Sequence, residues 1–139
     1  MASILKVDDL RGNTAAGNIT ITSEGGAATM QLQQGVAKCW CSLDGTGTIS
    51  VRDSFNTTSL TDNGTANYSV NIDNSMSSDG YVPTGSVVAS SSSNYYSYIT
   101  SAGSTSHIAT GSLTFRVVHN TGAFPDLNRV HVSIDGDLA

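Results

Sequence analysis

Charged residues are scarce in this sequence of 139 residues, and their scarcity excludes some classes of protein. Asp, Glu, Lys and Arg make up 12% of the chain, about half of the ~25% that is usual in soluble domains. The six Lys and Arg residues are scattered and the formal net charge is −5. No basic stripe could therefore neutralise a row of phosphates, and we expect no nucleic-acid partner.

Long apolar runs and strong helix formers are also missing. No stretch approaches the ~18 consecutive apolar residues of a membrane span, and residues 1–10 lack the pattern of a signal peptide. We expect a soluble, unsecreted protein without membrane insertion. Ser and Thr supply more than a quarter of the residues, and because they favour caps and turns over helix interiors, an all-α domain is excluded.

Cysteine occurs only at Cys39 and Cys41. Strand geometry would point both thiols to one face, an arrangement that suits a disulfide poorly, so we expect two packed, reduced thiols. A Cys-x-Cys metal site needs further ligands, and no second cysteine pair exists. Asp135 and Asp137 offer carboxylates, and His131 could meet its copies on a three-fold axis, but their spacing is more typical of turns and strands. We expect no metal and no cofactor.

Short alternating segments separated by turn signals fill the chain from residue 36 to its end. The pair Asn63-Gly64 gives the clearest hairpin signal. About eight short strands in roughly 100 residues are typical of an antiparallel sandwich. We therefore predict an all-β fold, an antiparallel β-sandwich over residues 36–139, with strands at residues 36–43, 47–52, 60–62, 66–72, 86–90, 95–100, 113–119 and 129–134.

The first 35 residues differ from the rest, because frequent turn signals leave only short alternating pieces at residues 4–8, 18–22 and 28–33. Ile19 and Ile21 share one face of their piece. Such pieces cannot bury a core by themselves. We predict that residues 1–35 form an extended or β attachment segment that packs on the body or pairs with copies of itself about a symmetry axis.

Four stretches of the sequence resemble one family of viral proteins. These are SILKVDDLRGN near the start, EGGAATMQLQQGVAKCW, GTGTISVRDSFNTTSLTDNGTANYSVNI at residues 45–72, and RVHVSIDGDLA at the end. Together they resemble fibre-type structural proteins of marine tailed phages. The resemblance implies a tail fibre-like virion protein that forms a homotrimer, is assembled in the bacterial host cytoplasm, and lies on the tail fibre or the particle surface.

The function expected from this resemblance is structural. The N-terminal segment would dock onto other virion proteins of the tail, baseplate or fibre adaptor, and the body would contribute to host adsorption through a cell-surface carbohydrate or protein. The alternative is a purely structural decoration or adaptor on the tail or capsid, with no receptor of its own. A third interpretation, a lectin-like domain unconnected with virions, requires the resemblance to be accidental.

Enzymatic activity is not expected from the sequence. His107, His119 and His131 lie outside any nucleophile-elbow motif, and the aspartates mostly occupy turn positions, where hydrogen bonds to the backbone explain them.

Aromatic residues supply the candidate contact sites. After a serine run come Tyr95, Tyr96 and Tyr98, and on a strand Tyr96 and Tyr98 would share a face. These tyrosines could form a receptor patch or fill the seam between trimer subunits, and both interpretations stay open. Trp40, on the opposite strand face from the two cysteines, is predicted to be an interface or core anchor.

The first testable prediction concerns assembly. Because the alternating faces of residues 1–35 have too little partner surface within one chain, the purified protein should be a trimer of 14.4 kDa chains. Multi-angle light scattering measures this mass directly. A stable monomer at micromolar concentration would contradict both the trimer and the resemblance to fibres.

Overall fold

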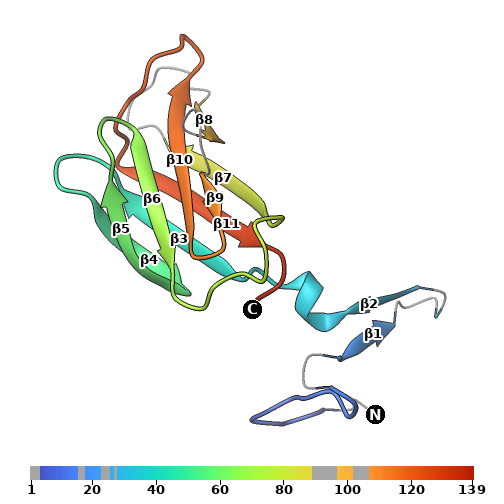
Figure 1. The fold of residues 1–139 in the computed structure, drawn as a ribbon. Helices are drawn as coiled ribbons and strands as arrows, with labels where there is room; N and C mark the ends of the chain where they lie inside the picture. Colours follow the sequence, from blue (N-terminus) through green and yellow to red (C-terminus); the bar gives the residue numbers. More distant parts are fainter. Residues whose placement is uncertain (1–3, 16–17, 23–25, 27, 89–96, 102–106) are drawn as a thin grey trace. The chain divides into compact units, whose positions relative to one another are not determined.

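The chain divides into two compact units in the computed structural model, Met1–Val36 and Ala37–Ala139 (Figure 1). We call them the N-terminal unit and the body. The structure describes residues 4–15, 18–22, 26, 28–88 and 107–139, and the backbone of residues 97–101. The division falls one residue after the boundary expected from the sequence.

Among its described residues, the N-terminal unit contains one small β-hairpin. β1 (Thr20–Thr22) pairs antiparallel with β2 (Thr29–Gln31), which places Ile21 opposite Met30. A 3-10 helix, η1 (Leu32–Gly35), follows β2 directly. Residues 4–8, which have the same alternation, form no strand.

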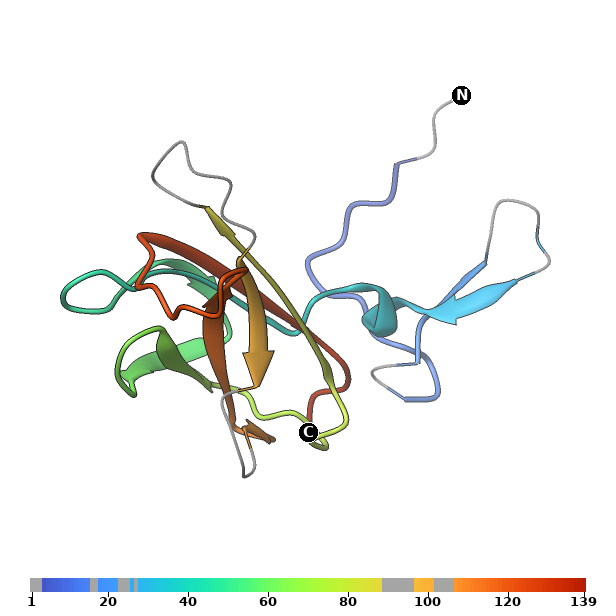
Figure 2. The same ribbon diagram turned by 90° about the horizontal axis from the view of Figure 1, so that it is seen from above.

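The body is built from two antiparallel sheets (Figures 1 and 2). The first has the strand order β4-β3-β11-β7, and the second has the order β5-β6-β10-β8, with β9 also paired to β10. The strands are β3 (Cys39–Asp44), β4 (Ser50–Phe55), β5 (Thr57–Asp62), β6 (Asn67–Ile72), β7 (Val82–Val88), β8 (Ser97–Ser101), β9 (Ile108–Ala109), β10 (Ser112–His119) and β11 (Arg129–Asp135).

The predicted all-β fold with antiparallel sheets is confirmed, and the arrangement is consistent with a β-sandwich. Each of the eight predicted strands overlaps a strand of the body, and the hairpin at Asn63-Gly64 joins β5 to β6. The prediction for β7 began four residues too late, at residue 86. Pro83 lies within β7, and a proline is tolerated there because β7 is an edge strand. The short β9 was not predicted.

Asn56 forms the corner at which the chain passes from the first sheet to the second. It is the single residue between β4 and β5, and its φ of 55° interrupts the extended backbone there. Its side-chain amide donates hydrogen bonds to the carbonyls of Lys38 (2.9 Å) and Asn74 (3.0 Å), and its Oδ1 accepts one from the amide of Asn74 (2.7 Å). Asparagine suits this position because it tolerates a positive φ and can satisfy nearby backbone groups.

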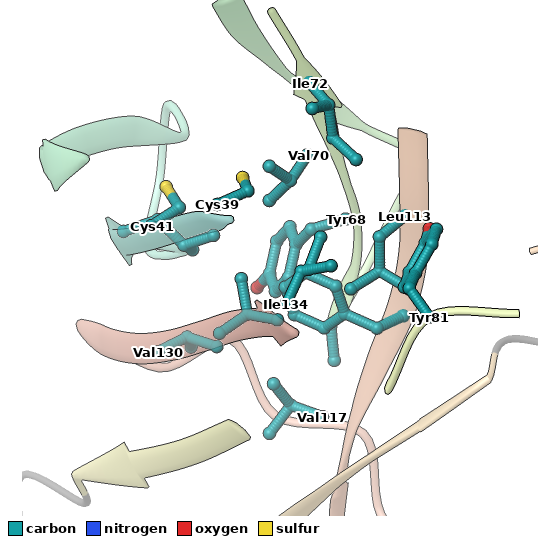
Figure 3. Close-up of a cluster of buried hydrophobic side chains, with 14 of the residues drawn as sticks. Cys39, Cys41, Tyr68, Val70, Ile72, Tyr81, Leu113, Val117, Val130 and Ile134 are labelled. Atoms are coloured by element: carbon teal, nitrogen blue, oxygen red, sulfur yellow. The ribbon is translucent and has the colours of Figure 1, made fainter. Parts of the chain in front are cut away.

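The core lies between the two sheets, where alternate residues of β3, β6, β10 and β11 meet (Figure 3). The strand pattern explains their burial, since Val130, Val132 and Ile134 all point to the same face of β11. Tyr68 is the largest fully buried side chain, and its ring packs edge-on against Phe115, with ring centroids 6.0 Å apart. Edge-to-face packing is a favourable geometry for an aromatic pair.

The hydroxyl of Tyr68 connects three parts of the body. It donates a hydrogen bond of 2.6 Å to Oδ1 of Asp126, which also accepts one of 2.7 Å from the amide of Ala66. The amide of Gly45, in the connection after β3, donates to the carbonyl of Leu127 beside them (2.9 Å). Burial, followed by the hydrogen bond to Asp126, raises the pKa of Tyr68 well above its usual value, so the phenol remains a donor at physiological pH.

Gly45 gives the testable prediction for the fold, because a Cβ there would overlap the phenol oxygen of Tyr68. Gly45→Ala should lower the free energy of unfolding by about 1–3 kcal/mol, as other overpacked sites do. Denaturant titration followed by circular dichroism measures this loss. The matched control is Gly80→Ala, whose Cβ would meet only the flexible Ser78 side chain at 3.4 Å. If both substitutions lower the free energy of unfolding equally, the close approach of Gly45 to Tyr68 does not constrain the fold.

Candidate functional site

The tyrosine patch expected from the sequence falls mainly outside the described residues. Tyr95 and Tyr96 are not among them, and for Tyr98 the structure gives only the backbone, in β8 opposite Val118 of β10. Whether these tyrosines face a receptor or a trimer seam therefore stays a prediction.

Trp40 lies on the outer face of the first sheet, away from the core. Its side chain is 37% exposed, whereas its neighbours Cys39 and Cys41 are fully buried on the inner face. Of the two roles expected for Trp40, the core role does not fit this position. The interface role remains a prediction.

Phe55 stands beside Trp40 on the same outer face. The two residues are paired directly across β3 and β4, and Phe55 is 54% exposed. Side chains opposite one another in an antiparallel pair lie close enough to touch one ligand. Phe55 was not among the candidates expected from the sequence, because the strand predicted there ends at residue 52 and its register with β3 cannot be read from the sequence.

Strand register extends this aromatic pair into two rows that cross the whole sheet. The first row runs Phe55, Trp40, Ser133, Thr84, and the second runs Asp53, Ser42, His131, Ser86. With neighbouring strands ~4.8 Å apart, each row of four positions spans about 14 Å. We call these eight residues the Trp40 face.

A hollow of about 450 Å³ lies on the Trp40 face, over β3, β11 and β7. Its lining includes the indole of Trp40, the imidazole of His131 and the hydroxyls of Ser42, Thr84, Ser86 and Ser133. Among the described residues, none of these six side chains makes a hydrogen bond within the protein. Their donors and acceptors are therefore open to solvent or to a ligand.

The predicted state of the cysteines is confirmed, since both thiols are free and buried. Burial raises the pKa of Cys39, against a weak opposing hydrogen bond with Thr57. Burial, with a smaller effect of Cys39, raises the pKa of Cys41 to about 11. Such thiols are poor nucleophiles and poor metal ligands near neutral pH.

The other titratable residues form no metal site in the described part of the chain, where no group of three or more His, Cys, Asp or Glu side chains has suitable geometry. His131 lies in the hollow, while the Nδ1 of His119 lies 2.6 Å from the hydroxyl of Thr121. Asp44 accepts hydrogen bonds from the hydroxyl and the amide of Thr46, and these lower its pKa.

A second candidate surface belongs to the N-terminal unit. Seven large apolar side chains among its described residues are exposed by 42% or more, namely Ile4, Leu5, Val7, Leu10, Ile21, Met30 and Val36. Ile21 and Met30 line a depression of about 230 Å³ together with Ala28 and Thr29. Contiguous exposed apolar patches mark interaction sites, which makes these side chains a candidate contact surface. We call it the apolar surface.

Comparison with known proteins adds no further assignment. No protein-family model, curated protein or solved structure matches the chain. No helix among the described residues has the length and apolar character needed to cross a membrane.

The burial of Cys41 and its raised pKa predict a slow reaction with thiol reagents. At pH 8 a thiol with a pKa of about 11 carries roughly a hundredfold less thiolate than one with the unperturbed value of 9.0. Cys41 in the folded protein should therefore react with Ellman's reagent at least a hundredfold more slowly than in denaturant. The unfolded chain, which exposes both cysteines, serves as the control. Rapid labelling of the folded protein would contradict the burial described above.

Proposed function

We propose that this protein is a fibre-like structural module of a tailed-phage virion. The N-terminal unit docks onto other virion proteins and joins three chains, and the body contributes to host adsorption. The module is non-enzymatic and is located at the tail fibre or particle surface. The sequence resemblance supplies the family, and the apolar surface of the N-terminal unit carries the proposal.

The apolar surface supports a docking role because the unit has no core to bury it among its described residues. Ile4 and Leu5 are each 76% exposed, and no residue of the described part of the unit is classed as buried. Burial of such side chains stabilises an association by roughly 25 cal/mol per Å² of apolar area. A partner that covers this surface gains that free energy, so the surface suits permanent assembly.

The body supports the adsorption role because its buried side chains form a core of its own. Its core is complete between two sheets, and its first and last strands, β3 and β11, are paired with one another. The core uses only the inner face of the first sheet, so the Trp40 face on its outer side remains available to a ligand. The alternative, a decoration or adaptor without a receptor, gives no role to a hollow lined by hydrogen-bonding groups without partners.

The apolar surface gives the test of this proposal. Replacing Ile21 and Met30, a cross-strand pair, by Ser in the full-length chain should prevent trimer formation and abolish incorporation into particles. Light scattering of the purified chain and quantification of the protein in purified virions measure the two effects. Circular dichroism should show a folded body, because these residues lie outside its core.

The matched control replaces Thr20 and Thr22, the neighbours of Ile21 on the opposite face of β1, by Ser. This variant should assemble normally, since it removes only two methyl groups from polar positions. Normal incorporation of the Ile21→Ser, Met30→Ser chain would refute the docking role of the apolar surface.

A further inference from the structure

We propose that the Trp40 face binds a neutral glycan. One sugar ring stacks on the indole of Trp40 beside Phe55, and the neighbouring sugars lie along the rows toward β7. The inference deepens the proposed adsorption role and rests on it for its biological meaning, whereas the binding itself is a property of the body. It differs from the tyrosine patch, of which only Tyr98 is described, in β8 of the second sheet.

The chemistry of the lining selects this ligand class. A sugar ring has a face of C–H groups and a rim of hydroxyls, so it needs an apolar plate next to small groups that both donate and accept hydrogen bonds. Trp40 and Phe55 provide the plate. Ser42, Ser86, Ser133 and Thr84 each provide a hydroxyl that can act as donor and acceptor.

Charge points to a neutral rather than an acidic glycan. No Asp, Glu, Lys or Arg lines the hollow. Asp53 extends the second row at its β4 end, and the whole chain has a formal net charge of −5. A carboxylate or sulfate on the ligand would find no Arg or Lys in the lining to pair with it.

The size of the site fits a short oligosaccharide. Binding sites for small molecules usually measure roughly 300–1,000 Å³, and the hollow measures about 450 Å³. The rows of about 14 Å are long enough for two or three sugar rings in line.

The composition of the Trp40 face distinguishes a glycan from a second copy of the chain. Protein interfaces are enriched in aromatic residues, Met and Arg, and are depleted in Ser and Asp. Three of the eight residues here are serines and one is Asp53. A face with four hydroxyls and a carboxylate is more polar than the core of such an interface.

Tryptophan fluorescence provides a direct test, because Trp40 is the only tryptophan of the chain. The purified full-length protein is titrated with maltotriose, cellotriose, chitobiose and lactose, and with 3′-sialyllactose as the acidic counterpart of lactose. We expect a saturable change with at least one neutral sugar, and weaker binding of sialyllactose than of lactose. No saturable change with any neutral sugar up to about 10 mM, a bound of roughly −3 kcal/mol, would overturn the proposal.

Two variants test whether the sugar binds at the Trp40 face. By calorimetry, Trp40→Ala should weaken the affinity for the sugar that binds by about tenfold or more, as removal of a central aromatic contact does. The control is Phe124→Ala, another exposed aromatic (45%) that lies outside both rows, and it should bind like the unchanged protein. Equal affinity of Trp40→Ala and the control would overturn the site.

Light scattering of the same variants tests whether a second copy of the chain, and not a glycan, covers the Trp40 face. If Trp40→Ala dissociates the trimer, the Trp40 face is an interface between copies and the glycan proposal fails. This outcome is distinguishable from failure of the docking role, which is measured by incorporation of the Ile21→Ser, Met30→Ser chain into virions.

Discussion

The hydrogen bond from the buried phenol of Tyr68 to Asp126 holds one end of the body together. Tyr68 comes from the second sheet, Asp126 from the connection between β10 and β11, and Gly45 from the connection after β3 in the first sheet. A buried hydroxyl without a partner would cost about 1–3 kcal/mol, so these three segments must meet. With Asn56 at the crossing from β4 to β5, this contact fixes how the two sheets face each other.

The way in which the two sheets face each other also decides which side chains lie on their outer faces. Inward residues of β3 and β11 fill the core, and the alternation of a strand then turns Trp40, Ser42, His131 and Ser133 outward together. The same alternation buries Cys39 and Cys41, which removes the two thiols from surface chemistry. The body thus offers solvent a surface of hydroxyls and aromatic rings with few charges, suited to recognising neutral polar ligands.

The N-terminal unit, unlike the body, has no buried core among its described residues. Its described residues form a single hairpin of three-residue strands, and an isolated hairpin of that size is marginally stable in water. Its exposed Ile, Leu, Val and Met side chains gain stability only when another surface covers them. The proposed division of labour, with assembly in one unit and recognition in the other, rests on this difference between an incomplete and a complete core.

The sequence alone determined the fold class, the order of the body strands and the inward face of each clear strand, because alternation and turn chemistry are local properties. It also placed Trp40 opposite the cysteines. It could not reveal that Phe55 pairs with Trp40, or that Ser42, His131 and Ser86 form one row, because register joins residues far apart in the chain. The Asn56 corner and the partnership of Tyr68 with Asp126 depend likewise on tertiary contacts, over 18 and 58 positions of sequence. Only strand pairing and the packing of the two sheets brought these residues together, since no local pattern encodes a neighbour that distant.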